Sequence, residues 1–397
     1  MPSISRRDSL AWALLEAAAF SVLAMVAAGS LLLMAAKLQY PGFGSGGSTI
    51  QALLAAVIAG LGSLGVPIHL GELTASALPV GALILIGWAS VWGTAHTLAR
   101  GATSTLPERV HAGLRLGLWL APICLILSLG FRISGATPVY ADAWGSLLLG
   151  GLWGAFFGAL GGLVSHSSFR HLWHSVFLLL GRAQESALGL RLAGIVLWSF
   201  AALGAAAVLL GVIAALVSGD RTAGFGLGDV VAAAVYVAAF GPNMVMAVVA
   251  LGAGSSVSVG AQISASGRSL GPSEGFSLLR WPPDGPPALA FGLLLLPILS
   301  TLIAGYRARK VALTRSDVFS ALRWTVPLVS FALFVGAAMA EARIGGDFLD
   351  KRGFARFAPD PWVLAFMGAL WTGGGVWLGW WVADRRPGSS SSTGGGR

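Results

Sequence analysis

Long apolar runs that contain no charged residue constrain this chain more than any other feature of its sequence. Residues 192–219 form a run of 28 positions without Asp, Glu, Lys or Arg. A helix of about 20 apolar residues crosses the hydrocarbon core of a bilayer, so such a run is typical of a membrane span. Of the 397 residues, 56% are hydrophobic and 10% are charged, whereas about 25% of the residues in soluble domains are charged. The sequence therefore predicts an all-α, polytopic integral membrane protein.

Eight runs are expected to form transmembrane helices. The shortest, 116–131, is bracketed by Arg115 and Arg132, whose long side chains can reach the membrane interfaces. The first, 9–36, is too long for the apolar region of a signal peptide, so we expect an uncleaved span. The expected spans are residues 9–36, 78–95, 116–131, 143–165, 192–219, 288–305, 324–340 and 362–383.

Two further apolar elements, 49–66 and 229–252, are expected to be discontinuous or re-entrant. Gly241 and Pro242 interrupt the second element, and proline lacks an amide hydrogen and clashes with the preceding turn, so a helix there should kink, split or reverse. The backbone groups that are freed must find partners in protein or in a water-filled cavity. Asn243, the only asparagine of the chain, could pair with them or face a ligand. Gly241, Pro242 and Asn243 are therefore the candidate contact or structural site.

An internal repeat relates the two halves of the chain. Seven identities at a constant offset of 218 positions, two of them tryptophans, indicate a tandem parallel duplication. The tryptophan that follows each Asp is expected to lie in an interfacial aromatic belt. The repeated residues are Asp142, Trp144, Gly150, Leu152, Trp153, Leu160 and Gly161, which recur as Asp360, Trp362, Gly368, Leu370, Trp371, Leu378 and Gly379.

The repeat divides the chain into two membrane units. The first occupies residues 1–165 and the second occupies residues 188–385. Between them, 166–187 has apolar residues at helical spacing with basic and polar residues on the other side, which predicts an amphipathic helix in the membrane interface. Residues 386–397 are mostly Gly and Ser, so we expect a disordered cytoplasmic tail.

The distribution of positive charge bears on how the chain threads the bilayer. If all ten apolar elements span, with both termini inside, 12 basic residues lie inside and 13 lie outside. If 49–66 and 229–252 return to the side from which they came, there are eight spans, and the counts become 16 inside and 9 outside. Basic residues favour the cytoplasmic side. The eight-span topology is therefore favoured, with ten spans as the alternative, and the two returning elements should meet near a pseudo-two-fold axis.

Several classes of protein are disfavoured by the residues that the chain offers. The basic residues are scattered among apolar runs and form no phosphate-binding face, so no nucleic-acid partner is expected. Cys124 is the only cysteine, and His171 with His174 lacks Cys or carboxylate ligands at suitable spacing, so neither a metal nor another cofactor is predicted. The sequence also lacks a catalytic constellation. An enzyme is therefore not expected.

Three stretches of the second half combine a Pro-Asn helix, a Gly-rich loop and a leucine-rich span with a basic end. They read FGPNMVMAVVALGAGSSVSVG at 240–260, RSLGPSE at 268–274 and PALAFGLLLLPILSTLIAGYRARK at 287–310. In this combination the chain resembles bacterial PerM-like membrane proteins, which are associated with cell division and the envelope. The stretch at 71–100, GELTASALPVGALILIGWASVWGTAHTLAR, likewise resembles that family and the related streptophobe group.

Two positions depart from the family pattern. Val80 stands where leucine is expected, and residues 252–255 read Gly-Ala-Gly-Ser in place of Gly-Pro-Gly-Phe. The resemblance implies a non-enzymatic protein of the bacterial inner membrane, and the favoured topology places both termini in the cytoplasm. It would stabilise or regulate an envelope or cell-division complex through contacts with the lipid bilayer or with other membrane proteins.

A rival function follows from the duplication itself. Carriers often place their site where paired discontinuous helices meet, so the chain could be a transporter or a lipid-handling channel. The predicted spans contain almost no acidic residue, which disfavours an ion-coupled carrier. A neutral or lipid substrate remains compatible with this composition.

Overall fold

The structure of this chain is a computed structural model. It describes residues 6–39, 48–100, 105–135, 137–166, 185–218, 227–265, 268–270, 273–276, 292–311, 314–348 and 351–385. Almost all of the expected interfacial helix at 166–187, and the expected tail at 386–397, lie outside these residues. The helices are α1 (Arg6–Gln39), α2 (Thr49–Gly62), α3 (Val80–Arg100), α4 (Leu106–Leu114), α5 (Leu116–Gly130), α6 (Ala143–His166), α8 (Glu185–Ser218), α9 (Leu227–Gly252), α10 (Leu295–Val311), α11 (Arg315–Met339) and α12 (Pro361–Asp384).

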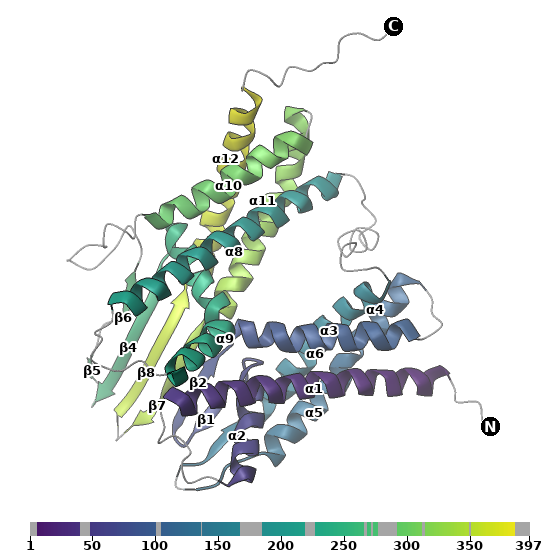
Figure 1. Cartoon of the computed structure of the whole chain (residues 1–397), viewed down its shortest axis with the longest axis vertical. Helices are drawn as coiled ribbons and strands as arrows, with labels where there is room; N and C mark the ends of the chain where they lie inside the picture. Colours follow the sequence, from purple (N-terminus) through teal and green to yellow (C-terminus); the bar gives the residue numbers. More distant parts are fainter. Residues whose placement is uncertain are drawn as a thin grey trace.

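The helices form two bundles that meet at one end of the molecule (Figure 1). Helices α1 to α6 form the first bundle, and α8, α10, α11 and α12 form the second. Helix α9 packs against α1 and α3 of the first bundle and against α8, α10 and α11 of the second. The strands lie at the end where the bundles meet, and the start of α1 and the end of α12 lie away from them (Figure 1). Helix α9 therefore joins the two bundles beside the strands.

Eight helical segments of the described chain are long and apolar enough to cross a membrane. Several of their largest apolar side chains are exposed, among them Trp88, Leu118, Trp198 and Phe331, as expected where lipid replaces water. Seven of the eight segments coincide with the expected spans. The eighth is Val230–Gly252 in α9. The expected span at 288–305 is not among the eight, because its helix, α10, has only 17 residues. The structure thus supports a multi-pass membrane protein.

An eight-stranded antiparallel sheet makes the all-α prediction wrong outside the expected spans. The strands run in the order β3-β1-β2-β7-β8-β4-β5, and β6 also pairs with β4. The strands come from the polar segments that connect the helices in both halves of the chain. The strands are β1 (Ile68–Leu70), β2 (Leu73–Ala77), β3 (Val139–Ala141), β4 (Val257–Ala265), β5 (Arg268–Leu270), β6 (Ser273–Phe276), β7 (Ala342–Phe348) and β8 (Lys351–Pro359).

Local sequence accounts for the strands that the composition concealed. In β4 the apolar residues Val257, Val259 and Ile263 alternate with small or polar residues, and this period of two is typical of a strand with one packed face. The hairpin of β1 and β2 turns through two residues, and the first, Gly71, has a φ of 63°. Glycine adopts this left-handed conformation without strain.

The order of the strands departs from the expected pseudo-two-fold arrangement. The set β3-β1-β2 is followed across the sheet by β7 and then by β8-β4 with β5 and β6. Strand β3 leads into α6 and strand β8 leads into α12, so both sets begin with the strand that precedes the last helix of its half. A two-fold axis along the membrane normal would reverse the second set. The sets instead follow one another head to tail.

Helix α9 corrects the expectation of a discontinuous element. It is a single α-helix from Leu227 to Gly252 with Pro242 in its interior. A proline removes one backbone hydrogen bond and crowds the carbonyl four residues earlier, and here the helix continues past it. The shorter element at 49–66 contains α2, which has 14 residues and no internal proline.

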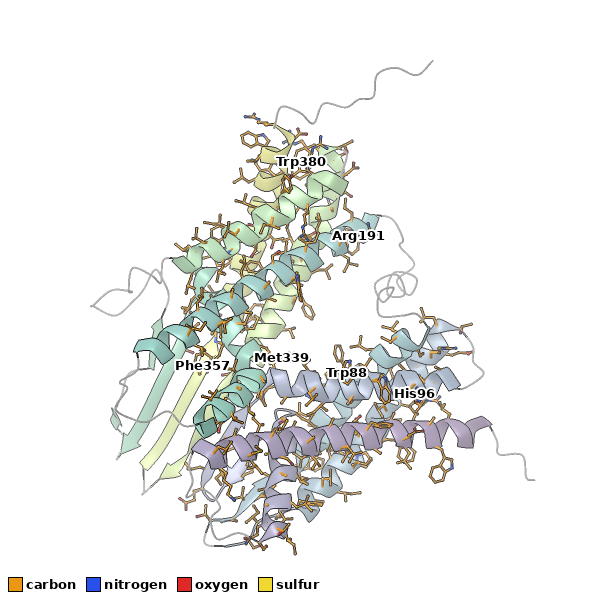
Figure 2. All side chains as sticks on the ribbon, viewed as in Figure 1. Trp88, His96, Arg191, Met339, Phe357 and Trp380 are labelled. Atoms are coloured by element: carbon orange, nitrogen blue, oxygen red, sulfur yellow. The ribbon has the colours of Figure 1, made fainter. Side chains whose placement is uncertain are left out.

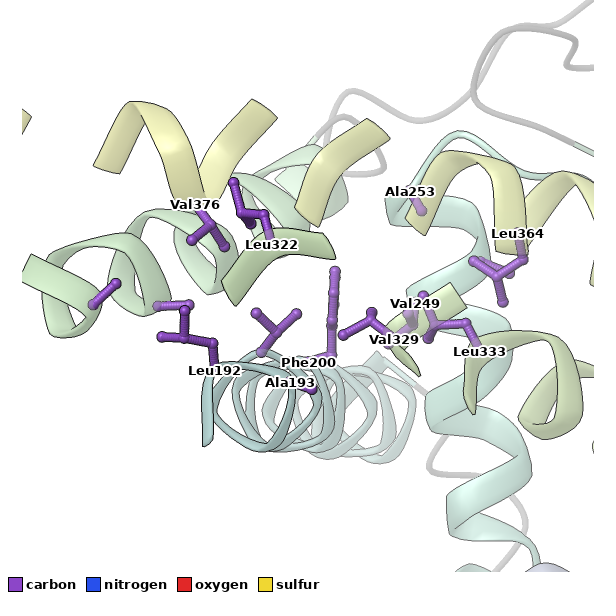
Figure 3. Close-up of a cluster of buried hydrophobic side chains, with 14 of the residues drawn as sticks. Leu192, Ala193, Phe200, Val249, Ala253, Leu322, Val329, Leu333, Leu364 and Val376 are labelled. Carbon is purple, nitrogen blue, oxygen red and sulfur yellow. The ribbon is translucent and has the colours of Figure 1, made fainter. Parts of the chain in front are cut away.

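The second bundle has the largest buried apolar cluster. Leu192 and Phe200 of α8 point toward Leu322 and Val329 of α11, and Val376 of α12 lies nearby (Figure 3). All five side chains are almost fully buried. Such interdigitated packing fixes how α8, α11 and α12 lie against one another.

Glycines bring helices of the same bundle into backbone contact. On α6, a Cβ at Gly154 would lie 2.9 Å from the Cα of Gly117 in α5. On α12, a Cβ at Gly379 would lie 2.7 Å from the carbonyl oxygen of Leu302 in α10. Small residues allow this approach in lipid, where apolar burial alone does not drive helices together.

The first prediction concerns one of these contacts. A Cβ at Gly113 of α4 would overlap the carbonyl oxygen of Gly158 in α6, so Gly113→Ala should push the helices apart. Overpacking of this kind costs about 1–3 kcal/mol, which should lower the Tm of the purified protein in detergent. Gly194→Ala in α8 is the control, because no atom lies within 4 Å of its added Cβ. Equal Tm values for the two variants would contradict the contact.

Candidate functional site

The two repeated aspartates begin equivalent helices. Asp142 precedes α6, and its carboxylate accepts a hydrogen bond from the backbone N–H of Gly145. Asp360 precedes α12, and its Oδ1 accepts from the N–H groups of Trp362 and Val363 at 3.0 and 3.1 Å. Carboxylates at this position satisfy N–H groups that lack a partner within the helix. Asp142 and Asp360 are thus helix caps.

The second tryptophan of each repeat fixes the end of another helix. The indole Nε1 of Trp153 donates to the carbonyl oxygen of Leu64 at 3.0 Å, just beyond α2. The indole Nε1 of Trp371 donates to the carbonyl oxygen of Ala253 at 3.1 Å, just beyond α9. The first tryptophans, Trp144 and Trp362, are 72% and 74% exposed, as the interfacial belt predicts.

The candidate residue Asn243 lies where three segments meet. It is 7% exposed, and its Oδ1 accepts a hydrogen bond from the backbone N–H of Val80 at 3.0 Å. Its Nδ2 donates to the carbonyl oxygen of Leu78 at 2.8 Å and to that of Met339 at 3.5 Å. Val80 begins α3 and Met339 ends α11, and helix ends carry unpaired backbone groups. One amide therefore satisfies the ends of helices from both halves.

The helix α3 cannot supply this cap itself. Pro79 is the residue before Val80, and its carbonyl oxygen already accepts from Leu83. A proline side chain has no hydrogen-bonding group, so it cannot accept from the first N–H of the helix. The Oδ1 of Asn243 takes that role from another helix.

The other two candidate residues have different surroundings. Pro242 cannot donate to the carbonyl of Ala238, four residues earlier. The backbone of α3 passes close to that carbonyl, because a Cβ at Gly81 would overlap the Ala238 oxygen. Gly241 has only Val237 near its missing Cβ, at 3.8 Å. The Ala238 carbonyl and the Asn243 amide thus both lie at the start of α3, while Gly241 makes no close approach.

An open cavity of about 460 Å³ adjoins this junction. Figure 2 shows Met339, one of its lining residues, where the two bundles meet. Its walls are mostly apolar and come from the ends of α2, α6 and α11, and from β2 and β7. The lining residues are Leu64, Gly65, Ser76, Ala77, Leu78, Leu149, Trp153, Phe334, Val335, Ala338, Met339, Glu341 and Arg343.

Glu341 and Arg343 line the polar end of the cavity, and Arg356 is hydrogen-bonded to Glu341 beside them. The Oε1 of Glu341 accepts from the Nε of Arg343 and from the Nε of Arg356, each at 2.6 Å. The two arginines are direct partners across β7 and β8, so the carboxylate separates two like charges. Partial burial raises the pKa of Glu341, but the hydrogen bonds and charges of both guanidiniums outweigh it and hold the pKa below its ordinary value of 4.5.

A polar cluster occurs on the strands of the first half. His69 is the direct neighbour of Thr74 on one side and of Tyr140 on the other. Its Nδ1 lies 3.1 Å from the Thr74 hydroxyl, its Nε2 lies 4.0 Å from Asp142, and its ring stacks on Tyr140 at 4.8 Å. The guanidinium of Arg132 lies over the ring of Tyr140, 5.2 Å from its centroid. These are ordinary cross-strand contacts that stabilise a sheet.

No group of three or more His, Cys, Asp or Glu suited to hold a metal occurs within the described residues. His171 and His174 lie outside them. The sequence points to Asn243 but does not indicate the cluster of Glu341, Arg343 and Arg356, because Arg356 is 15 residues from Glu341 and meets it only when the β7–β8 hairpin forms.

No protein-family model, curated protein or solved structure matches this chain. Inferences about its function therefore depend on the geometry described above.

The second prediction tests the role of Asn243. Asn243→Ala leaves the partly buried N–H of Val80 and carbonyl of Leu78 without these partners, which should cost about 1–3 kcal/mol and lower the Tm in detergent. Asn243→Asp keeps an acceptor for Val80 but sets an oxygen against the Leu78 carbonyl, so it should also be destabilising. The control is Gln51→Ala at the exposed cap of α2. A Tm for Asn243→Ala within error of this control would contradict the bridge.

The third prediction concerns pH. Because the folded pKa of Glu341 is lowered, the ionised carboxylate stabilises the fold fully above its ordinary pKa, and this stability is lost as the pH falls through the folded value. Glu341→Gln removes the charge at every pH. The Tm difference between wild type and Glu341→Gln should therefore be constant at neutral pH and shrink below about pH 4.5. A difference that does not change down to pH 3 would argue against the ion cluster.

Proposed function

We propose that the chain is a tandem parallel duplication whose halves span the membrane in the same orientation. Two matched interactions and one matched pair of helices support this. The backbone N–H of Asp142 donates to Pro67 at 2.9 Å, and that of Asp360 donates to Ser256 at 2.9 Å. The indoles of Trp153 and Trp371 donate to carbonyls beyond α2 and α9. Helices α6 and α12 also begin and end 218 positions apart, the offset of the sequence repeat.

We further propose eight spans in which α9 does not cross the membrane. Its start lies against Leu38, at the end of α1 that is near the sheet, since a Cβ at Gly228 would contact that side chain at 3.5 Å. Its end leads directly into β4. Both ends of α9 are therefore beside the sheet, as a continuous helix that lies in the membrane interface requires.

Helix α10 then takes the place of the eighth span. It starts near Gly252, whose added Cβ would lie 2.6 Å from the Leu293 carbonyl, and it reaches the far end of α12, where Arg309 pairs with Asp384 at 2.9 Å. The spans are α1, α3, α4 with α5, α6, α8, α10, α11 and α12. Both termini then lie opposite the sheet, on the side that carries 16 of the 25 basic residues. This side is proposed to be the cytoplasm of a bacterium.

The proposed function is that of a non-enzymatic inner-membrane scaffold, which stabilises or regulates an envelope or cell-division complex through protein or lipid contacts. The observation that carries it is the pairing of β2 with β7 over five residues, from Leu73↔Gly346 to Ala77↔Ala342. This pairing joins the halves in one sheet, and Asn243 joins them again beneath it. A carrier that rocks one half against the other would have to break these bonds. A fixed frame has no such requirement.

The rival proposal, a lipid-handling protein, is favoured by one observation. The cavity lies between the halves and has apolar walls. A lipid could be held there without movement of the halves. Transfer of that lipid would require the halves to move, and this requirement distinguishes the rival from the scaffold.

The fourth prediction tests the topology. In a Cys124→Ser background, single cysteines at Lys37, Glu72 and Ser256 should react with an impermeant thiol reagent applied to intact cells. Lys37 and Ser256 lie near the two ends of α9, so a crossing α9 would place them on opposite sides. A cysteine at Ser316 should react only after the cells are opened. Protection of Ser256→Cys together with labelling of Lys37→Cys would overturn the eight-span proposal.

The fifth prediction tests the fixed frame. Adjacent pairs in an antiparallel ladder alternate in geometry, and disulfides suit the closer kind. One of two cysteine pairs, at Ala75 with Ile344 or at Thr74 with Gly345, should therefore cross-link the halves. In a strain that depends on the protein, the oxidised form should preserve septum shape and detergent resistance as well as the reduced form does.

A matched control links strands of one half only, with cysteines at Leu70 and Val139. Loss of cell function by the cross-linked halves, reversed by a reductant and not seen in this control, would favour the moving carrier over the scaffold.

A further inference from the structure

We propose that the cavity between the two halves binds an anionic phospholipid of the surrounding bilayer. The phosphate lies at Arg343 and Arg356, and the part of an acyl chain next to the headgroup lies against the apolar walls. The proposal does not depend on the scaffold role, because binding is a property of the isolated protein.

The walls of the cavity suit an acyl chain. Leu78, Leu149, Phe334 and Met339 are apolar and come from both halves, and the cavity is open on one side. Its volume of about 460 Å³ lies within the range of ligand sites, about 300–1,000 Å³. It is therefore large enough for a headgroup with the first part of a chain.

The polar end of the cavity suits a phosphate. Two guanidiniums share the single carboxylate of Glu341, which leaves one net positive charge. Each is engaged there through Nε, and among the described residues their terminal nitrogens make no hydrogen bond. Arg343 lines the cavity, and its side chain is 59% exposed. A guanidinium with free terminal donors binds phosphate oxygens in a bidentate manner.

The depth of the cavity matches the interface of the membrane. Trp144 and Trp362 are exposed at the starts of α6 and α12, where interfacial tryptophans are expected. Leu149 lies five residues beyond Trp144, or about 7.5 Å deeper along the helix. Phe334 packs edge to face on Trp362 at 4.8 Å between ring centroids. The arginines are on the sheet side of this level, where headgroups lie.

The experiment compares lipids that differ only in their headgroups. Purified protein is delipidated in detergent, and its binding of phosphatidylglycerol and of phosphatidylcholine with identical chains is measured by native mass spectrometry. We expect tighter binding of phosphatidylglycerol, by roughly tenfold for one charged contact. Inorganic phosphate at millimolar concentration should not compete, because it lacks the acyl chain. Competition by phosphate would overturn the lipid assignment in favour of a plain anion site.

Two variants address the two ends of the site. Arg343→Gln should remove the preference for phosphatidylglycerol, while Arg132→Gln, a basic residue on the same side but over Tyr140, should keep it. Ala338→Trp should fill the cavity and reduce the binding of both lipids. Its control, Ala201→Trp, lies on an exposed face of α8 and should have no effect.

The Ala338→Trp variant keeps the test decisive if Arg343→Gln does not fold. Equal retention of the two lipids by wild type, or unchanged retention by Ala338→Trp, would overturn the proposal.

Discussion

A buried backbone group must have a hydrogen-bond partner, and at the junction of the two bundles this requirement is met by one side chain. The first N–H of α3, the carbonyl before it and the last carbonyl of α11 all converge on the amide of Asn243. Helix ends cannot satisfy these groups internally, and lipid cannot satisfy them at all. The amide is suited to the task because it offers both donors and an acceptor. Helices from both halves can end at this point only because α9 carries that amide between them.

The same requirement accounts for the sheet. The connections between apolar helices contain polar backbone that has left the helices, and pairing between strands satisfies such groups without further side chains. Strand β2 of the first half gains β7 of the second as its neighbour, so neither half exposes that edge. The junction is therefore held by two layers: the sheet outside and the amide of Asn243 beneath. A rigid connection follows from hydrogen-bond satisfaction alone, before any function is assigned.

How much of this could be predicted from the sequence depended on how local each signal was. Spans such as 143–165 were predictable, because length and hydropathy suffice in lipid. The strand β4 was mistaken for a loop, since its Gly and Ser residues concealed the alternation of Val257, Val259 and Ile263. The repeat predicts an interfacial place only for its first tryptophans, Trp144 and Trp362, and it does not indicate that the indoles of Trp153 and Trp371 hold helix ends. The partners of Asn243, more than 90 residues away along the chain, could not be read from the sequence at all.

The two copies of the apolar element differ in a way that explains why the junction is asymmetric. Matching the helix ends at Leu64 and Ala253 places Leu54 of α2 opposite Asn243 of α9. Helix α2 has 14 residues and α9 has 26, and the additional turns of α9 precede Ala238. Those turns contact the first bundle at Leu38, and Ala238, where they end, lies close to Gly81. One copy has thus been extended across the molecule and given an amide, while the other stays within its own half with an apolar residue at that position. A single bridging helix is sufficient to fix two bundles, whereas a carrier that alternates between two symmetric states would gain from two equivalent ones.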